Sequence, residues 1–159
     1  MGLSSLEICA GAGGQALGIE QAGFEHVSLV EIEVAACQTL RINRTHWHVT
    51  EGDLRHYAAE KWKGIELLAG GVPCPPFSMA GKQLGHEAER DLFHEAIRLV
   101  SECKPPAVLL ANVNGLRDSV FDEHRAKRLA EFKKLCYLHD THLLNRDVFG
   151  VHQSPPRVF

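Results

Sequence analysis

The chain has 159 residues, a length that suits one compact domain, and its 45% hydrophobic and 23% charged residues exclude a disordered polypeptide. Lys and Arg total 17 against 20 Asp and Glu, and this net charge of -3 excludes a protein that holds nucleic acid through a strong overall positive charge. No apolar run is long enough to span a membrane and residues 1–5 lack the basic start of a signal peptide, so we expect a soluble, cytoplasmic protein.

Short apolar runs rich in β-forming residues alternate with helical stretches along the chain. This alternation predicts a doubly wound α/β fold, in which helices cover both faces of a parallel sheet. In such sheets ligands bind at the carboxyl ends of the strands. In chain order we expect strands at 6–9, 27–31, 48–51, 65–69, 107–110 and 142–145, and helices at 15–22 (closed by Gly23), 34–43, 91–102 and 124–137.

The five cysteines are widely spaced, odd in number and form no C-x-x-C pair, which argues against a zinc site or a disulfide framework. His46 and His48, on either side of Trp47, have no carboxylate or cysteine at ligand spacing, so satisfied histidines in a surface loop are favoured over a metal site. We therefore expect no metal. Cys74 is considered below, and the other four are expected to be buried small hydrophobic side chains: Cys9, Cys37, Cys103 and Cys136.

The first predicted strand is followed by the glycine-rich turn Ala10-Gly11-Ala12-Gly13-Gly14, which leads directly into a helix. Glycines at such a place let a ligand approach the backbone closely, and a helix start presents N–H groups. The same pattern occurs in plain tight turns. By itself it indicates a nucleotide-type site only weakly.

Acidic residues follow the next two predicted strands. Glu31 ends the second strand, where α/β cofactor sites commonly bond ribose hydroxyls, and Asp53 follows the third, where a carboxylate can meet an adenine amino group. Each has an ordinary alternative, as a solvated strand-end acid or a turn aspartate. Together with the glycine turn they predict a site for an adenosine-containing cofactor, without saying which one.

A cysteine between prolines follows the fourth predicted strand, in the run Gly70-Gly71-Val72-Pro73-Cys74-Pro75-Pro76-Phe77-Ser78. Proline restricts φ and removes a hydrogen-bond donor, so the shape of this loop is preset. A structural cysteine has little use for a stiff loop, whereas a nucleophile needs a fixed direction of attack. The reactive form is the thiolate, which a free cysteine with a pKa of about 8.5 reaches only with help. Cys74 is therefore a candidate nucleophile.

The Pro-Cys segment resembles the signature of the DNA cytosine-5 methyltransferases. Residues 6–14 resemble the first motif of that family, which binds S-adenosylmethionine. Glu31, Asp53 and the segments 90–93, 112–113 and 153–157 follow in the family's motif order, so the resemblance extends over essentially the whole chain. It implies a Rossmann-like, S-adenosylmethionine-dependent methyltransferase fold without its last strand. Residues 1–159 would form an incomplete cofactor-binding and catalytic domain, with the target-recognition domain absent.

The resemblance also implies a reaction. A cytosine of double-stranded DNA is flipped into the site, the Cys74 thiolate bonds to its C6, and C5 takes the methyl group of S-adenosylmethionine. Loss of the C5 proton then expels the cysteine. Cys74 and Arg157 would be catalytic, and the cofactor would contact Cys9, Ala10, Gly11, Gly13, Gly14, Glu31, Ile32, Asp53, Leu54, Pro73 and Leu92.

Two residues depart from the family's catalytic motifs. Ala111 stands where a Glu-Asn-Val motif has its acid, and loss of such a group costs roughly 10²–10⁴-fold in rate. Pro155 replaces the first arginine of a Gln-x-Arg-x-Arg motif, while Arg157 remains. The chain also stops where the resemblance predicts a further strand, which inserts between two strands already present. Two explanations remain: one half of a split enzyme completed by a second chain, or a truncated, decaying product or fragment. The paired loss of the acid and the first arginine favours the second.

Three functions follow from these observations. The first is a DNA cytosine-5 methyltransferase of the restriction–modification type. The second is a catalytically dead remnant of that family that binds the cofactor or a partner. The third is a methyltransferase for another substrate, which the Pro-Cys loop disfavours because most such enzymes need no cysteine there.

Overall fold

The computed structural model describes residues 2–73, 92–113, 122–144 and 157–159. The predictions that concern Cys74, Asp91 and Pro155 therefore lie outside the described residues. The chain forms two compact units. We call Met1–Val72 with Leu92–Leu110 the sheet unit, and Pro73–Asp91 with Ala111–Phe159 the second unit.

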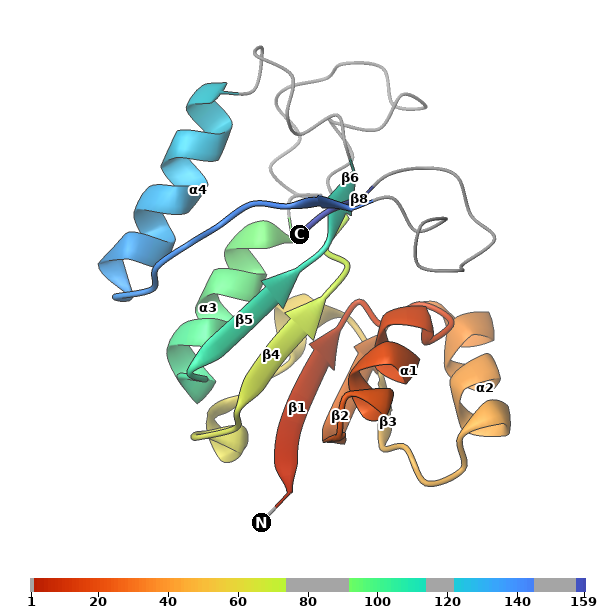
Figure 1. Ribbon diagram of the computed structural model, residues 1–159. Coiled ribbons are helices and arrows are strands. Elements are labelled where there is room, and N and C mark those ends of the chain that lie inside the picture. The colour runs from red at the N-terminus through yellow and green to blue at the C-terminus, as the bar shows by residue number, and fades with distance from the viewer. Residues whose placement is uncertain (1, 74–91, 114–121, 145–156) are drawn as a thin grey trace. The chain divides into compact units, whose positions relative to one another are not determined.

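The sheet unit is built on five parallel strands, which run side by side in Figure 1 in the order β3-β2-β1-β4-β5. Their apolar side chains form the core, with Leu6, Ile8 and Leu68 fully buried. The order reverses beside β1, from which the chain first builds outward to β3 and then to β5 on the other side. The strands are β1 (Leu3–Ile8), β2 (Phe24–Glu31), β3 (Val49–Glu51), β4 (Leu67–Gly70) and β5 (Ala107–Leu110).

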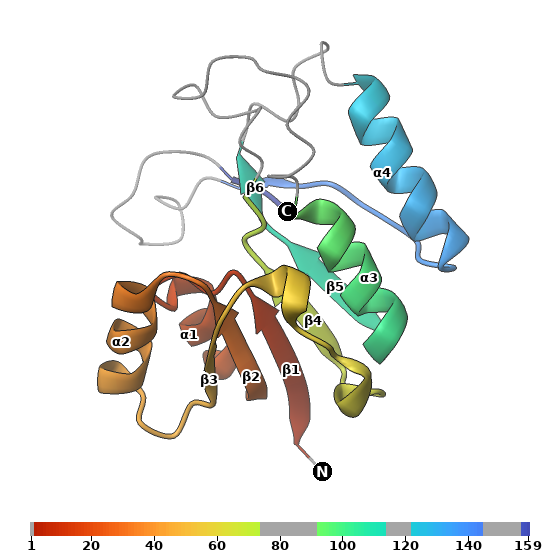
Figure 2. The ribbon, with the colours of Figure 1, turned by 180° about the vertical axis from the view of Figure 1, so that it is seen from behind.

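Helices cover both faces of this sheet, as a doubly wound fold requires. Right-handed crossovers place α1 (Gly14–Gln21) and α2 (Val34–Asn43) on one face and α3 (Phe93–Cys103) on the other, as Figures 1 and 2 show from opposite sides. Two short 3₁₀ helices, η1 (Leu54–His56) and η2 (Glu60–Trp62), connect β3 to β4. The predicted α/β class is confirmed. None of the helices in the described part of the chain is long and apolar enough to cross a membrane.

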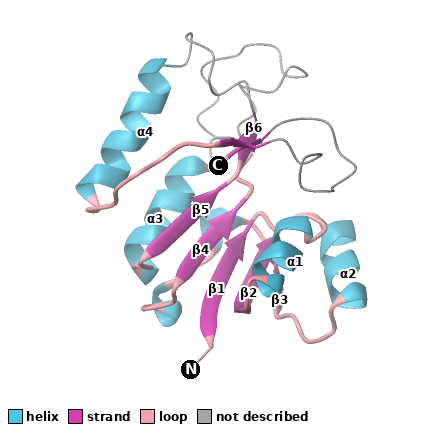
Figure 3. Ribbon diagram, in the orientation of Figure 1, coloured by secondary structure: helices cyan, strands magenta, loops and turns pink. Residues whose placement is uncertain are grey.

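The second unit contains α4 (Asp122–Lys134) and three two-residue strands, drawn in magenta in Figure 3. These are β6 (Asn112–Val113), β7 (Leu143–Leu144) and β8 (Arg157–Val158), which pair antiparallel in the order β6-β8-β7. β8 lies between β6 and β7 in this small sheet, which is separate from the five-stranded one. A short antiparallel sheet was not expected from the sequence, because two-residue strands have no readable periodicity.

Several predicted boundaries were wrong by two or three residues. β1 begins at Leu3 rather than at residue 6, because the polar Ser4 and Ser5 obscure its start. It ends at Ile8, since Cys9 has a φ of 51°, outside the range of a strand. β2 begins three residues earlier than expected, β4 is shifted by up to two residues, and α4 ends at Lys134 rather than at residue 137.

The predicted burial of four cysteines is correct for two of them. Cys37 and Cys103 are buried on the core-facing sides of α2 and α3. Cys9 is half-buried, and Cys136 is exposed. Cys136 follows α4 in a turn with a φ of 64°, so no helix face directs its side chain into a core.

The loop around Trp47 has the satisfied histidine that the sequence suggests. His46 Nε2 and Trp47 Nε1 each lie 2.8 Å from Glu20 Oε1, and the Trp47 ring is buried. Within the described ranges, no three His, Cys, Asp or Glu side chains are grouped so as to hold a metal ion.

Candidate functional site

The glycine turn begins where β1 ends, at the carboxyl edge of the sheet. Cys9, Gly11 and Gly13 have positive φ values of 51°, 55° and 89°. The Gly13 N–H donates to the carbonyl of Ala10 at 3.1 Å, and the Gly13 carbonyl accepts from Leu17 N at 2.9 Å. The turn thus closes on itself and starts α1 within a few residues.

Gly13 is required by its surroundings as well as by its φ. A Cβ atom there would lie 2.6 Å from Leu40 Cδ2 and 3.1 Å from Trp47 Cζ3, which are both buried. A Cβ on Gly11 or Gly14 would meet nothing within 4 Å. The turn is therefore packed against the protein at Gly13 and open at Gly11 and Gly14.

Glu31 ties the turn to the end of β2. Its side chain is buried, and Oε2 accepts from Gly11 N at 2.7 Å while Oε1 accepts from Ile32 N and Glu33 N at 2.9 and 2.8 Å. Its backbone carbonyl accepts from Gly52 N at 2.8 Å. One residue therefore links the carboxyl ends of β1, β2 and β3.

Asp53 follows Gly52 and caps η1. The backbone N–H of Arg55 donates to Asp53 Oδ1 at 2.9 Å, and the Arg55 guanidinium contacts both carboxylate oxygens at 2.6–3.1 Å. The side-chain hydrogen bond from Arg55 is the main reason that the pKa of Asp53 falls to about 2. Asp53 is thus an ionised acceptor at neutral pH, and its neighbour Leu54 is buried.

Cys9 lies close to both carboxylates. Burial first, and then the negative charges of Glu31 and Asp53, raise the pKa of its thiol to about 12. The Cys9 thiol therefore stays protonated at neutral pH and is not a nucleophile. Cys9, Glu31 and Asp53 lie at or just after the ends of the parallel strands β1, β2 and β3, so they share one edge of the sheet although they are far apart in sequence.

The other predicted site residues fall into two groups. In the sheet unit, Ala10 is buried with its N–H 3.2 Å from the carbonyl of Val30, Ile32 is 60% exposed, and Leu92 caps α3. In the second unit, Pro73 is exposed. Arg157 lies in β8, and its side chain is outside what the structure describes, as is Cys74. The structure therefore brings the cofactor candidates of residues 9–14, 31–32 and 53–54 together.

Two features near this edge were missed from the sequence. Glu7, in β1, is only 1% exposed, and burial raises the pKa of its carboxyl to about 8. Arg98, on α3, contacts the backbone of η1, as described below. The sequence does contain a signal for Glu7, because an acidic residue within an otherwise apolar strand predicts a buried carboxyl group. The charged residues of α3 at spacings of three and four also read as a solvated helix face.

The strand order, with a glycine turn at the carboxyl end of the central strand and an acid at the end of the next, is that of Rossmann-like α/β proteins. The sequence model of the C-5 cytosine-specific DNA methylases matches residues 3–159. The chain belongs to the C-5 cytosine-specific DNA methylase family.

The chain is similar to several type II methyltransferases. It is 60% identical to M.NgoMIV of Neisseria gonorrhoeae over 158 residues and 47% identical to M.NaeI of Lentzea aerocolonigenes over 158 residues. These alignments cover 99% and 98% of this chain, but 51% and 38% of the relatives, so the chain spans about half or less of their length. M.AquIA of Picosynechococcus is 32% identical, and the alignment covers 97% of this chain and 69% of that relative.

Solved structures share the fold. A DNA modification methyltransferase encoded within an Escherichia coli prophage superposes with a TM-score of 0.82 at 26% identity, covering 98% of this chain and 45% of the other. Spodoptera frugiperda DNMT2 superposes with a TM-score of 0.77 at 22% identity, covering 98% of this chain and 48% of the other, which is a likeness of fold alone.

Proposed function

We propose that this chain is the S-adenosylmethionine-binding part of a DNA cytosine-5 methyltransferase of the restriction–modification type. The observation that carries the proposal is the Glu31 carboxylate, which is buried, accepts three backbone N–H groups and joins the glycine turn to the ends of two further strands. Such an arrangement is a preformed edge for a nucleoside. The family membership and the similarity to type II methyltransferases support S-adenosylmethionine as the nucleoside ligand.

The residues present fit an adenosine-containing group. Gly11 and Gly14 leave open space at the turn, so a ligand can approach the backbone there. Glu31 holds a fixed acceptor for ribose hydroxyls, Asp53 is an ionised acceptor for an adenine amino group, and the exposed side chain of Ile32 offers apolar surface to a purine ring. When bound, S-adenosylmethionine supplies a methyl group carried on a sulfonium centre.

The remaining roles rest on the family motifs. Cys74 would attack C6 of a flipped cytosine in double-stranded DNA, and Arg157 would hold the base in the site. Residues 1–159 would form the cofactor-binding and catalytic domain, and target recognition would come from a further part of the enzyme or from a partner chain. The enzyme would act in the cytoplasm, as restriction–modification requires access to DNA.

A second candidate is a member of the family that binds the cofactor but does not catalyse. Ala111 favours it, because alanine at the position between β5 and β6 has no proton or hydrogen bond to offer a substrate. Covalent trapping separates the two candidates. The chain with Ala111→Glu and Pro155→Arg, supplied with the C-terminal part of a relative, is expected to form an adduct with 5-fluorocytosine DNA that Cys74→Ser abolishes. If no adduct forms, the catalytic proposal fails.

Cofactor binding is tested by calorimetric titration of the chain with S-adenosylmethionine. Gly14→Val is the informative variant, because its side chain would enter open space at the turn, block the ligand and leave the packing intact. Gly18→Val is the matched control, since it makes the same change on the exposed side of the same helix, also in open space. Saturable binding that Gly14→Val abolishes and Gly18→Val retains supports the proposal. Binding that both variants retain contradicts it.

A further inference from the structure

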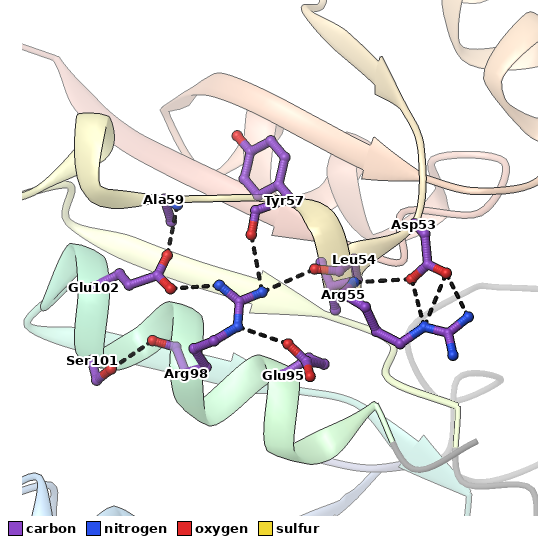
Figure 4. Close-up of polar contacts among 9 residues, drawn as sticks. All are labelled: Asp53, Leu54, Arg55, Tyr57, Ala59, Glu95, Arg98, Ser101 and Glu102. Carbon is purple, nitrogen blue, oxygen red and sulfur yellow. Dashed lines mark hydrogen bonds and ion pairs between the residues drawn. The ribbon is translucent and has the colours of Figure 1, made fainter. Parts of the chain in front are cut away.

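Arg98 on α3 contacts the segment that carries Asp53 and Leu54, as Figure 4 shows. Its Nη2 donates to the carbonyl oxygens of Leu54 at 3.0 Å and Tyr57 at 2.9 Å, at the start and just after the end of η1. These carbonyls lie 44 and 41 residues away in sequence. One guanidinium nitrogen thus bridges both ends of this 3₁₀ helix.

Two glutamates of the same helix complete the contact. Arg98 Nε donates to Glu95 Oε2 at 2.7 Å, and Arg98 Nη1 donates to Glu102 Oε1. The second oxygen of Glu102 accepts from the backbone N–H of Ala59 at 2.7 Å. The side chains of α3 therefore hold three backbone groups of residues 54–59 at once. The guanidinium is also fixed in direction, because planar Arg–carboxylate bonds allow few geometries.

The segment 53–59 is a short 3₁₀ turn whose backbone hydrogen bonds join close neighbours in sequence. Within it, His56 N donates to the Asp53 carbonyl at 3.0 Å and Tyr57 N donates to the Leu54 carbonyl at 3.2 Å. Short 3₁₀ turns of this kind are weakly stabilised by themselves. Arg55 fixes the Asp53 carboxylate relative to η1. The place of that carboxylate at the edge of the sheet therefore depends on the contacts that hold η1.

We propose that Arg98 is a positioning residue for nucleoside recognition, which holds η1 so that Asp53 reads the amino group of an adenine ring. This role rests on the proposed function, because it assumes that an adenosine-containing ligand binds at this edge. Arg98 lies on α3 and would not touch the ligand. It acts through its hydrogen bonds to the carbonyl oxygens of Leu54 and Tyr57.

The test is calorimetric titration of the 159-residue chain with S-adenosylhomocysteine and with S-inosylhomocysteine, in which a carbonyl replaces the adenine amino group. The unsubstituted chain is expected to prefer S-adenosylhomocysteine by about tenfold, the value of one charge-assisted hydrogen bond. Arg98→Gln is expected to reduce this ratio to about one. Asp53→Asn should reduce it equally, and the double variant should show no further change.

Controls separate positioning from folding. Arg98→Lys keeps one donor for a carbonyl and is expected to retain part of the preference, and Glu102→Gln should lose part of it. Glu66→Gln is the matched control, because Glu66 also accepts a backbone N–H, from Ser4 at 2.7 Å, but at the opposite edge of the sheet. It should keep the full preference. Melting curves of each variant report the folded fraction.

The outcomes distinguish this role from the proposed function. If Arg98→Gln binds more weakly or melts earlier but keeps the preference for S-adenosylhomocysteine, Arg98 is structural and the inference is wrong. If the unsubstituted chain binds both ligands equally, the inference is also wrong while the cofactor site stands. If the unsubstituted chain binds neither ligand, the proposed function fails, and the role of Arg98 with it.

Discussion

At the carboxyl edge of the five-stranded sheet, Cys9, Gly11 and Gly13 have left-handed backbone conformations, and a buried carboxylate, that of Glu31, binds backbone N–H groups. At the amino edge, the Glu66 carboxylate also accepts a backbone N–H. Its Oε2 accepts from Ser4 N at 2.7 Å and from Ser4 Oγ at 2.6 Å, across the start of β1.

The two edges therefore differ in what their polar groups support. Glu66 closes the ladder between two neighbouring strands, which any sheet needs. Glu31 organises a turn whose backbone is unfavourable for most residues and whose open side is at Gly11 and Gly14. Positive φ values also occur at the amino edge, at Gly23, Gly64 and Lys104. The carboxyl edge differs in its buried Glu31 carboxylate, which binds the backbone of an open glycine turn, as expected where a ligand binds.

The largest expected effect is at Gly13. Gly13→Ala would place a methyl group 2.6 Å from Leu40 Cδ2 in a residue with a φ of 89°, which should cost about 3 kcal/mol of unfolding free energy. Gly18→Ala, in open space within α1, should instead add about 0.5–1 kcal/mol. Urea unfolding of both variants checks this. Equal midpoints would mean that the packing of the turn is not constrained.

The next effect concerns Glu7, one residue before the carboxyl end of β1. Burial raises the folded-state pKa of Glu7 to about 8 from its ordinary value of 4.5. The unfolded state therefore ionises first, and the folded state loses stability as pH rises from about 4.5 to 8. Glu7→Gln should remove this dependence and raise the unfolding free energy at pH 7 by up to about 3 kcal/mol. Urea midpoints measured from about pH 5 to 8 test it. If the midpoints of the variant change with pH as those of the parent do, Glu7 is not a buried acid that stays neutral in the folded state.

Glu31→Gln should have a smaller effect on stability and a clear one on binding. A glutamine offers one acceptor oxygen instead of two, so either Gly11 N or the pair Ile32 N and Glu33 N loses its partner. We expect the unfolding free energy to fall by about 2 kcal/mol and the affinity for S-adenosylmethionine to decrease. If binding is unchanged in the folded variant, the carboxylate supports only the turn.

The smallest effect is expected at the amino edge, for Glu66→Gln. One amide oxygen can still accept from both Ser4 groups, since both bond to a single oxygen in the parent. Hydrogen bonds from Ser4 lower the pKa of Glu66, so its contribution is present above the unfolded pKa and is lost as pH falls. The variant should therefore differ little from the parent at pH 7 and lose less stability in acid. A loss at pH 7 as large as that of Glu31→Gln would erase the difference between the edges.

The sequence predicted those parts of the fold that show as local patterns of residues. The strand–helix alternation, the glycine turn and Gly23 after α1, and the acids after β2 and β3, are visible without long-range contacts. The start of β1 was not visible, because Ser4 and Ser5 are polar residues whose partners, Glu66 and His26, lie elsewhere in the chain. Cys136 was expected to be buried because free cysteines often are. That expectation was wrong, since the residue type does not tell which side of a turn faces a core.

What the sequence by itself determined is the class of fold, the family and the set of residues that gather at the carboxyl edge, since these follow from motif order and periodicity. Only the tertiary structure decided how those residues act on one another. Glu31 binds the backbone of the glycine turn, Arg55 holds both oxygens of Asp53, and Arg98 reaches η1 from another helix. The reason is physical: hydrogen bonds and electrostatic shifts depend on distances between side chains and backbone groups that only the folded chain sets. Glu31 and Gly11 are 20 positions apart, and Arg98 and Leu54 are 44 positions apart.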